Sequence, residues 1–195
     1  MKYIKLLIMT CMIFSITFTS FNSVYAKEKK LSGISVVTNK KHPRYCDSVK
    51  KFEKYRKKAK KGLITIGDYD NSDKRILHID NTDDKCVNNI EIYIENTKKK
   101  RITDKKALKI IKSYLPKKKK LEEYYETPEI QKLKNSDDNL TYYAISYHHK
   151  DYYNNNPEDY PGNIHAYAES DERGVKFIRI NWKAPRHFMN YEKIE

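Results

Sequence analysis

The sequence predicts an α+β protein in which antiparallel sheet packs against one or two amphipathic helices, after a cleaved N-terminal signal peptide. Residues 102–116, ITDKKALKIIKSYLP, place apolar side chains at helical spacing between a threonine and a proline. Short segments elsewhere alternate apolar and polar side chains, as strands do. Segments rich in Asp, Asn and Ser separate these runs and are typical of turns.

The first 26 residues have the pattern of a secretory signal peptide. Lys2 and Lys5 precede an apolar run at 6–18, and Val-Tyr-Ala at 24–26 offers a cleavage site. The run is shorter than the roughly 20 residues of a spanning helix, so we expect no transmembrane anchor after cleavage. Lipidation at Cys11 is the weaker alternative, because no small residue directly precedes it. We therefore expect a secreted, extracellular protein. We also expect it to be a monomer.

Residues 27–101 form the first predicted unit, a basic α+β half. We expect a short strand at 34–37 and a lysine-rich helix at 47–61, which Asp47 caps and Gly62 ends. Strands are predicted to follow at 63–69, 75–80 and 90–95.

Residues 102–195 form the second predicted unit, a helix followed by antiparallel sheet. After the helix at 102–116, the lysines at 117–120 are expected to be a charged linker, and Thr127-Pro128 to open a short helix that reaches about residue 134. Strands are predicted at 140–147, 163–168 and 175–182, the last two joined as a hairpin by residues 169–174. The tail is expected to pack at the sheet edge through Trp182, Phe188 and Met189.

Charge is distributed unevenly along the chain. Residues 27–120 contain 29 Lys and Arg against 12 Asp and Glu, whereas residues 121–195 contain 9 against 14. An A+T-rich genome would also enrich lysine, but such bias would not confine the excess to one half. The basic half predicts an anionic partner. We assign its binding surface to Lys50, Lys51, Lys54, Arg56, Lys57, Lys58, Lys60 and Lys61.

Tyrosine is concentrated in the acidic half, which holds ten of the seventeen tyrosines. Tyrosine offers a large amphipathic contact area and is favoured at recognition surfaces. About half of those in strands are expected to be core residues. We expect a partner-binding role for Tyr152, Tyr153 and Tyr160, which lie in one predicted loop.

The histidines at 148, 149 and 165 are the candidates for metal or acid–base chemistry. In a strand, His148 and His149 point to opposite faces, so only one of them can join His165. A ligand set of His149, Asp151 and His165 is conceivable, but zinc-type helical spacing is absent, and we expect neither a metal nor another cofactor. A hydrolase could draw on a base, an acid and a cation; the residues of these types are His165, Glu169, Arg179, Arg186 and His187.

Two cysteines remain after removal of the signal peptide, Cys46 and Cys86. Outside the cell such a pair can oxidise to a disulfide. We favour the bridge over two free thiols.

One part of the chain resembles a known family. ITDKKALKII, a polar connection and strands ending in GVKFIRINW are similar to the helix-then-sheet arrangement of PepSY-like domains of exported bacterial proteins, over about residues 102–182. The resemblance implies a non-catalytic α+β binding module and transfers no functional residue, and the connection at 117–139 is longer than the family pattern. The chain also resembles small lysine-rich secreted proteins of low-G+C Gram-positive bacteria, several of which act on host defence molecules, which implies a role in virulence.

These observations predict a secreted, non-enzymatic binding protein with no catalytic residues. Its expected partner is an extracellular protein of host or envelope, or an anionic polymer, and not an intracellular nucleic acid. The alternative is a small secreted hydrolase, such as a nuclease, that uses histidines of the C-terminal strands.

Overall fold

The structure is a computed structural model that describes residues 29–67, 73–80, 87–135, 140–150, 163–181 and 192–193. The chain divides into two units, Met1–Lys30 and Leu31–Glu195. All described helices and strands belong to the second unit. The predicted signal peptide and most of the predicted tail lie outside the described residues.

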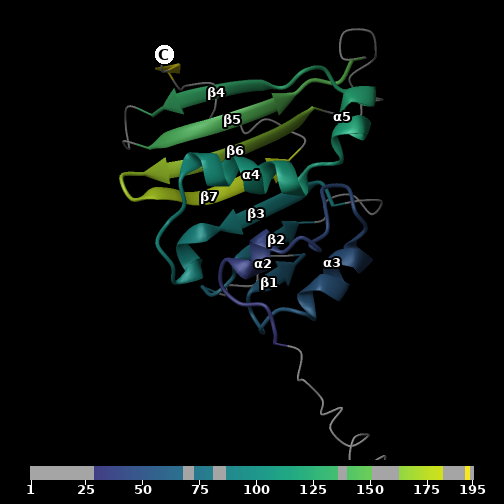
Figure 1. The fold of residues 1–195 in the computed structure, drawn as a ribbon, viewed down its shortest axis with the longest axis vertical. Coiled ribbons are helices and arrows are strands. Elements are labelled where there is room, and N and C mark those ends of the chain that lie inside the picture. Colours follow the sequence, from purple (N-terminus) through teal and green to yellow (C-terminus); the bar gives the residue numbers. More distant parts are fainter. Residues whose placement is uncertain are drawn as a thin grey trace, which may run out of the picture. The chain divides into compact units, whose positions relative to one another are not determined.

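An eight-stranded sheet organises this unit, and its strand order is β1-β2-β3-β7-β6-β5-β4-β8 (Figure 1). All neighbouring strands run antiparallel except β1 and β2. The prediction of an α+β fold with antiparallel sheet is confirmed. The strands are β1 Ile64–Ile66, β2 Leu77–Asp80, β3 Asn89–Tyr93, β4 Glu129–Lys134, β5 Thr141–Tyr147, β6 Ile164–Asp171, β7 Gly174–Asn181 and β8 Glu192–Lys193.

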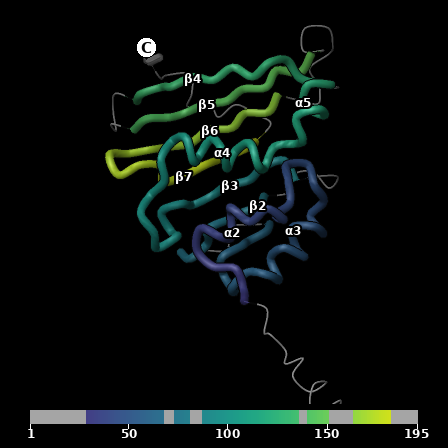
Figure 2. The backbone as a smooth tube through the Cα atoms, in the orientation of Figure 1, coloured from purple at the N-terminus to yellow at the C-terminus, as the bar shows by residue number. Residues whose placement is uncertain are grey.

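The described helices lie toward one side of the sheet (Figures 1 and 2). α4 covers β6 and β7, α3 packs by β1, and α5 lies near the ends of β5 and β6. The helices are α2 Ser35–Thr38, α3 Val49–Arg56, α4 Asp104–Tyr114 and α5 Lys118–Tyr124, with the 3₁₀ helix η1 at Ile94–Thr97.

The predicted helix at 102–116 is confirmed as α4. Thr103 occupies the N-cap position with extended backbone, and Asp104 lies in the first turn, where the helix dipole favours a carboxylate. Ala107, Ile110 and Ile111 are buried at spacings of three and four residues. This face packs on the sheet, so the lysines between these positions point to solvent.

The two predicted halves share the sheet, because β3 of the first half pairs with β7 of the second. Their register places Ile90 opposite Ile180 and Ile92 opposite Ile178. All four side chains are fully buried in the main core. The boundary predicted near residue 101 therefore does not separate two sheets, because strands from both predicted halves belong to the same sheet.

A smaller apolar cluster lies on the other face of the sheet. It contains Leu133, Tyr142 and Tyr167. Tyr142 and Tyr167 alternate along their strands with residues of the main core, and Leu133 lies opposite Tyr142. These tyrosines belong to the core.

Three local predictions were wrong. Residues 34–37 were expected as a strand but lie in and beside α2, where Val36 and Val37 are both buried. The lysines at 117–120 begin α5 instead of forming a linker, and residues 129–134 form β4 instead of a helix. Strand pairing decided the last case, because β4 satisfies its backbone groups along the edge of β5.

Other predicted elements are present with shifted ends. The lysine-rich helix ends at Arg56, five residues earlier than expected, and begins after Ser48, not Asp47. The hairpin of β6 and β7 is confirmed, but its strands extend to Asp171 and Gly174, which leaves a short turn between them.

Candidate functional site

The eight basic residues assigned from sequence lie on and directly after α3, and all are exposed. The helix is held from its other face, where Phe52 and Tyr55 are buried and the Tyr55 hydroxyl donates to the Val36 carbonyl at 2.7 Å. Lys50, Lys51, Lys54 and Arg56 lie in the helix, whereas Lys57, Lys58, Lys60 and Lys61 follow it.

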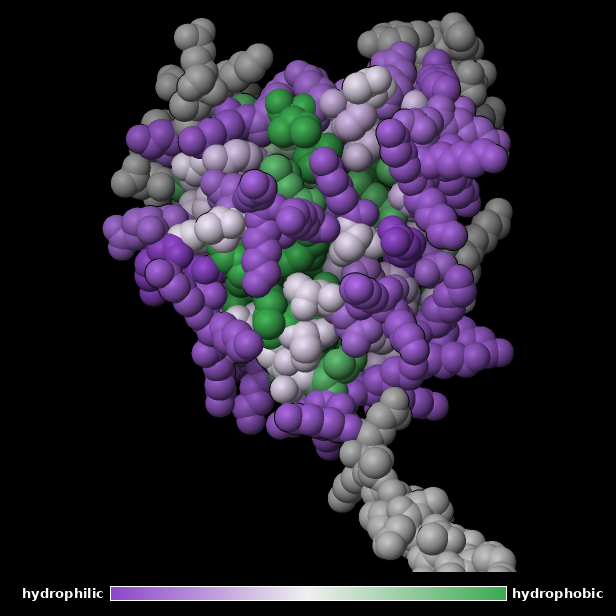
Figure 3. Space-filling model, viewed as in Figure 1, coloured by the Kyte–Doolittle hydropathy of each residue, from purple (hydrophilic) through white to green (hydrophobic). Residues whose placement is uncertain are grey.

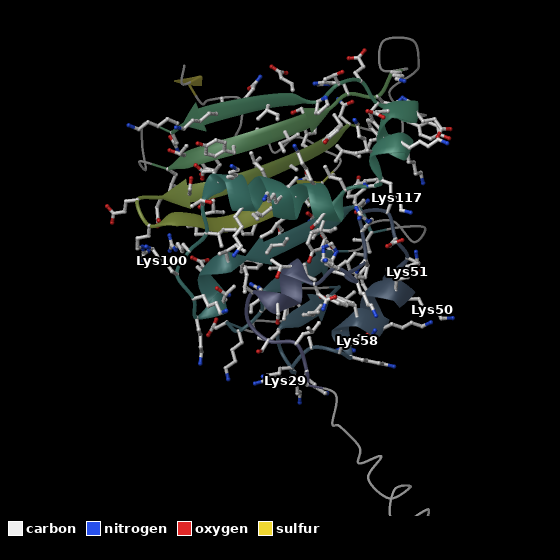
Figure 4. The ribbon with its side chains drawn as sticks, viewed as in Figure 1. Lys29, Lys50, Lys51, Lys58, Lys100 and Lys117 are labelled. Atoms are coloured by element: carbon white, nitrogen blue, oxygen red, sulfur yellow. The ribbon has the colours of Figure 1, made fainter. Side chains whose placement is uncertain are left out.

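Exposed lysines of α4 and α5 lie on the same side of the sheet as those of α3 (Figure 1). These further lysines were not assigned to the binding surface from the sequence. Figure 4 shows Lys50 and Lys51 of α3 along the same side as Lys117, with Lys100 at the opposite side of the view. Figure 3 shows that this side is mostly hydrophilic, with apolar groups between the charged ones. We call this surface the lysine face. It comprises the eight residues above with Lys105, Lys106, Lys109, Lys112 and Lys117–Lys120, all of which are exposed.

Few carboxylates neutralise the lysine face. Lys51 pairs with Asp47 at 2.5 Å, Arg56 with Glu53 at 2.9 Å, and Lys118 with Glu122 at 3.4 Å. Within the described part of the chain, its other cations form no ion pair. Neighbouring exposed cations of one sign raise the local concentration of anions and favour their binding.

The described tyrosines of the acidic half divide between the core and the surface. Tyr142, Tyr147 and Tyr167 are buried. Tyr124 is 46 % exposed. The predicted recognition tyrosines at 152, 153 and 160 lie outside the described residues.

Of the two adjacent histidines, His148 is the one that lies beside His165 in the described part of the chain. His165 lies beside His148, with ring centroids 6.3 Å apart, and its Nδ1 lies 3.1 Å from the Ser146 hydroxyl oxygen. His149 instead contacts Tyr124 and Tyr125. Burial lowers the pKa of His165, and the neighbouring His148 lowers it further. Asp151 lies outside the described residues, among which no three His, Cys, Asp or Glu side chains form a metal-binding group.

Two of the candidate hydrolase residues form ion pairs. Arg179 forms an ion pair with Glu91, and Glu169 forms one with Lys176. Glu91 is 2 % exposed and also accepts a hydrogen bond from the Tyr93 hydroxyl at 2.7 Å. Arg186 and His187 lie outside the described residues.

Glu91 belongs to a polar row across four strands that the sequence did not reveal. His78 of β2 lies opposite Glu91, and Glu91 lies opposite Arg179. The Nδ1 of His78 lies 2.8 Å from the Thr65 hydroxyl oxygen. Burial lowers the pKa of His78, and Glu91 partly opposes this effect. The only sequence signal was a carboxylate between isoleucines in a strand, which does not identify its partners.

A cavity of about 700 Å³ opens between the end of α4, α5 and β5. Its volume is in the range typical of small-ligand pockets. Its apolar wall consists of Leu115, Pro116, Leu121, Tyr125, Pro128 and Tyr147. Its charged lining consists of the exposed Lys112, Lys118, Glu122, Glu126 and Lys150. Sequence reasoning missed this cavity because it expected a linker where α5 forms the wall.

The backbone of Cys46 is held beside the residue that follows Cys86. The Cys46 N–H donates to the Val87 carbonyl at 2.8 Å, and the Val87 N–H donates to the Asp47 carbonyl at 3.1 Å. Cys46 is disulfide-bonded. Cys86, its expected partner, lies outside the described residues.

Within the described ranges, no helix has the length and apolar character needed to cross a membrane. No protein-family model matches the chain, and neither a curated protein nor a solved structure matches it. The resemblance to PepSY-like domains therefore stays a prediction.

Proposed function

We propose that the mature chain is a secreted, non-enzymatic protein that binds an extracellular polyanion through the lysine face. The observation that carries this proposal is that α3, α4 and α5 lie toward one side of the sheet (Figure 1) and that their lysines are exposed. Pairing of many lysines with a polyanion releases its counterions, so binding is expected to weaken steeply with salt.

The geometry favours a polyanion over the protein partner that the sequence also predicted. The tyrosines assigned to partner binding, Tyr152, Tyr153 and Tyr160, lie outside the described residues, so the case for a polyanion rests on the lysines. The lysine face is exposed and has few internal ion pairs.

A non-enzymatic role is also favoured over hydrolysis. A phosphodiester-cleaving site would need a cation for the phosphate, and the Arg179 guanidinium already pairs with Glu91. His149 and His165 contact different partners. Hydrolysis of nucleic acid that His165→Ala abolishes would overturn this part of the proposal.

Heparin chromatography of residues 27–195 tests the polyanion assignment. We compare Lys54→Gln/Lys57→Gln/Lys58→Gln on the lysine face with a matched triple substitution of Lys98–Lys100 to Gln. Both variants lose three exposed charges, and Lys100 lies away from Lys58 (Figure 4).

The lysine-face variant should elute at clearly lower salt than the wild type, and the control close to the wild type. Equal shifts would mean that only net charge matters and would refute a defined binding face. Absence of retention at low salt would refute polyanion binding itself.

A further inference from the structure

The cavity beside α5 shares residues with the lysine face, which suggests that one ligand contacts both. Lys112 of α4 and Lys118 of α5 belong to both surfaces. A bound polyanion that follows these lysines passes the cavity opening. What enters the cavity then depends on the chemistry of its wall.

The wall is suited to a flat ring. Tyr125 and Tyr147 meet edge to face, with ring centroids 6.5 Å apart, and prolines at 116 and 128 complete the lining. Leu115 and Leu121, which are buried, also line the cavity. Aromatic side chains beside a cationic track are the usual means of holding single-stranded nucleic acid, because every base can stack.

The carboxylates of Glu122 and Glu126 distinguish a nucleotide from other anionic units. A sulfated sugar brings its anionic groups close to these carboxylates and is repelled by them. A base instead brings an amino group or a ring N–H, whose hydrogen bond a carboxylate accepts, while its phosphate lies outside on the lysines. The side chains that line the cavity therefore match a unit with a flat donor-bearing ring and an external negative charge.

We propose that this cavity receives a base of extracellular single-stranded nucleic acid whose phosphates lie along the lysine face. The inference rests on the proposed polyanion binding and names its ligand class. It assigns base contact to Tyr125 and Tyr147, and phosphate contact to Lys112 and Lys118.

Fluorescence anisotropy with labelled dC12 and an abasic 12-mer of the same backbone separates the base from the phosphates. Both ligands carry the same charge, so electrostatics alone predicts equal affinity. A stacked base should make dC12 bind about tenfold more tightly than the abasic strand. Heparin and inorganic polyphosphate serve as competitors that lack bases.

Variants of the cavity locate the effect. Tyr125→Ala removes an aromatic wall, and Thr127→Trp, at an exposed lining position, fills the cavity without removing core packing. Both should bring dC12 down to the affinity of the abasic strand and leave the abasic strand unchanged. Tyr124→Ala is the matched control, because Tyr124 does not line the cavity; it should keep the tenfold difference.

Each other result overturns a defined statement. Equal affinity for dC12 and the abasic strand, or displacement of dC12 by heparin at far lower concentration, would refute the nucleic-acid assignment and leave polyanion binding intact. Loss of the difference in Tyr124→Ala but not in Tyr125→Ala would place stacking on the open surface and refute the cavity assignment. Failure of all four polyanions to bind would refute the proposed function as well.

Discussion

The turn of the β6–β7 hairpin packs closely against the segment that leads into α4. Gly174 has φ +107°, and a Cβ added there would lie 2.8 Å from the Ile102 carbonyl oxygen. That oxygen accepts a hydrogen bond from the Val175 N–H at 2.9 Å. It therefore cannot move away without weakening the link between hairpin and helix segment. Gly174→Ala should be strongly destabilising.

The magnitude follows from two separate costs. Positive φ costs a residue with a Cβ about 1–2 kcal/mol, and overpacking against backbone adds about 1–3 kcal/mol. Gly67 provides the control, because its φ is +86° but an added Cβ there meets nothing within 4 Å. We expect Gly174→Ala to lower the free energy of unfolding by about 3 kcal/mol and Gly67→Ala by only about 1 kcal/mol.

Urea unfolding followed by far-ultraviolet circular dichroism measures both variants under the same conditions. The midpoint should fall much further for Gly174→Ala, with little change in the slope of free energy against urea. Equal losses in the two variants would show that backbone strain accounts for the whole effect. The close approach of the hairpin to Ile102 would then be refuted as a constraint.

Two further predictions concern the disulfide and the histidines. If Cys46 is bonded to Cys86, Cys46→Ser should cost about 4 kcal/mol of unfolding free energy on the chain-entropy model, and a reducing agent should destabilise the wild type but not the variant; an unaffected wild type would contradict the bridge. Burial lowers the pKa of His42, His78 and His165 from 6.5. As the pH falls below 6.5, the unfolded chain therefore binds protons more readily than the folded chain does. Stability measured by urea unfolding should therefore be greatest above pH 6.5 and decline toward pH 5.5, and a flat profile over this range would argue against it.

Sequence patterns predicted a helix or strand correctly where the residues that determine it lie close together in the chain. Thr103, the Ala107–Ile110–Ile111 stripe and Pro116 lie within one helix length, and the predicted helix is present as α4. β5, β6 and β7 also occur where alternating residues predicted strands.

Local patterns failed where the outcome depended on a distant partner. Pro128 is well suited to the first turn of a helix, yet residues 129–134 pair with β5 because that strand offers an edge. Ile34 to Val37 have strand-like composition, but the short helix α2 buries both valines in the core. Propensity is a weak preference that such tertiary contacts override.

The candidate site was likewise predicted only in part from the sequence. Sequence reasoning located the basic residues of α3, all of which are exposed, but it assigned none of the lysines of α4 and α5 to their surface. It also had no means of finding the cavity, whose lining runs from Lys112 to Lys150 along the chain.

The sequence alone determined how much charge each segment carries and where α4 forms, because residue charge and helical spacing are local properties. Which charges become neighbours was decided only by the tertiary structure. The pairing of β3 with β7 and the packing of α4 on β6 and β7 join the two halves in one sheet. Buried isoleucines stabilise this pairing, and the sequence does not specify which of them will meet.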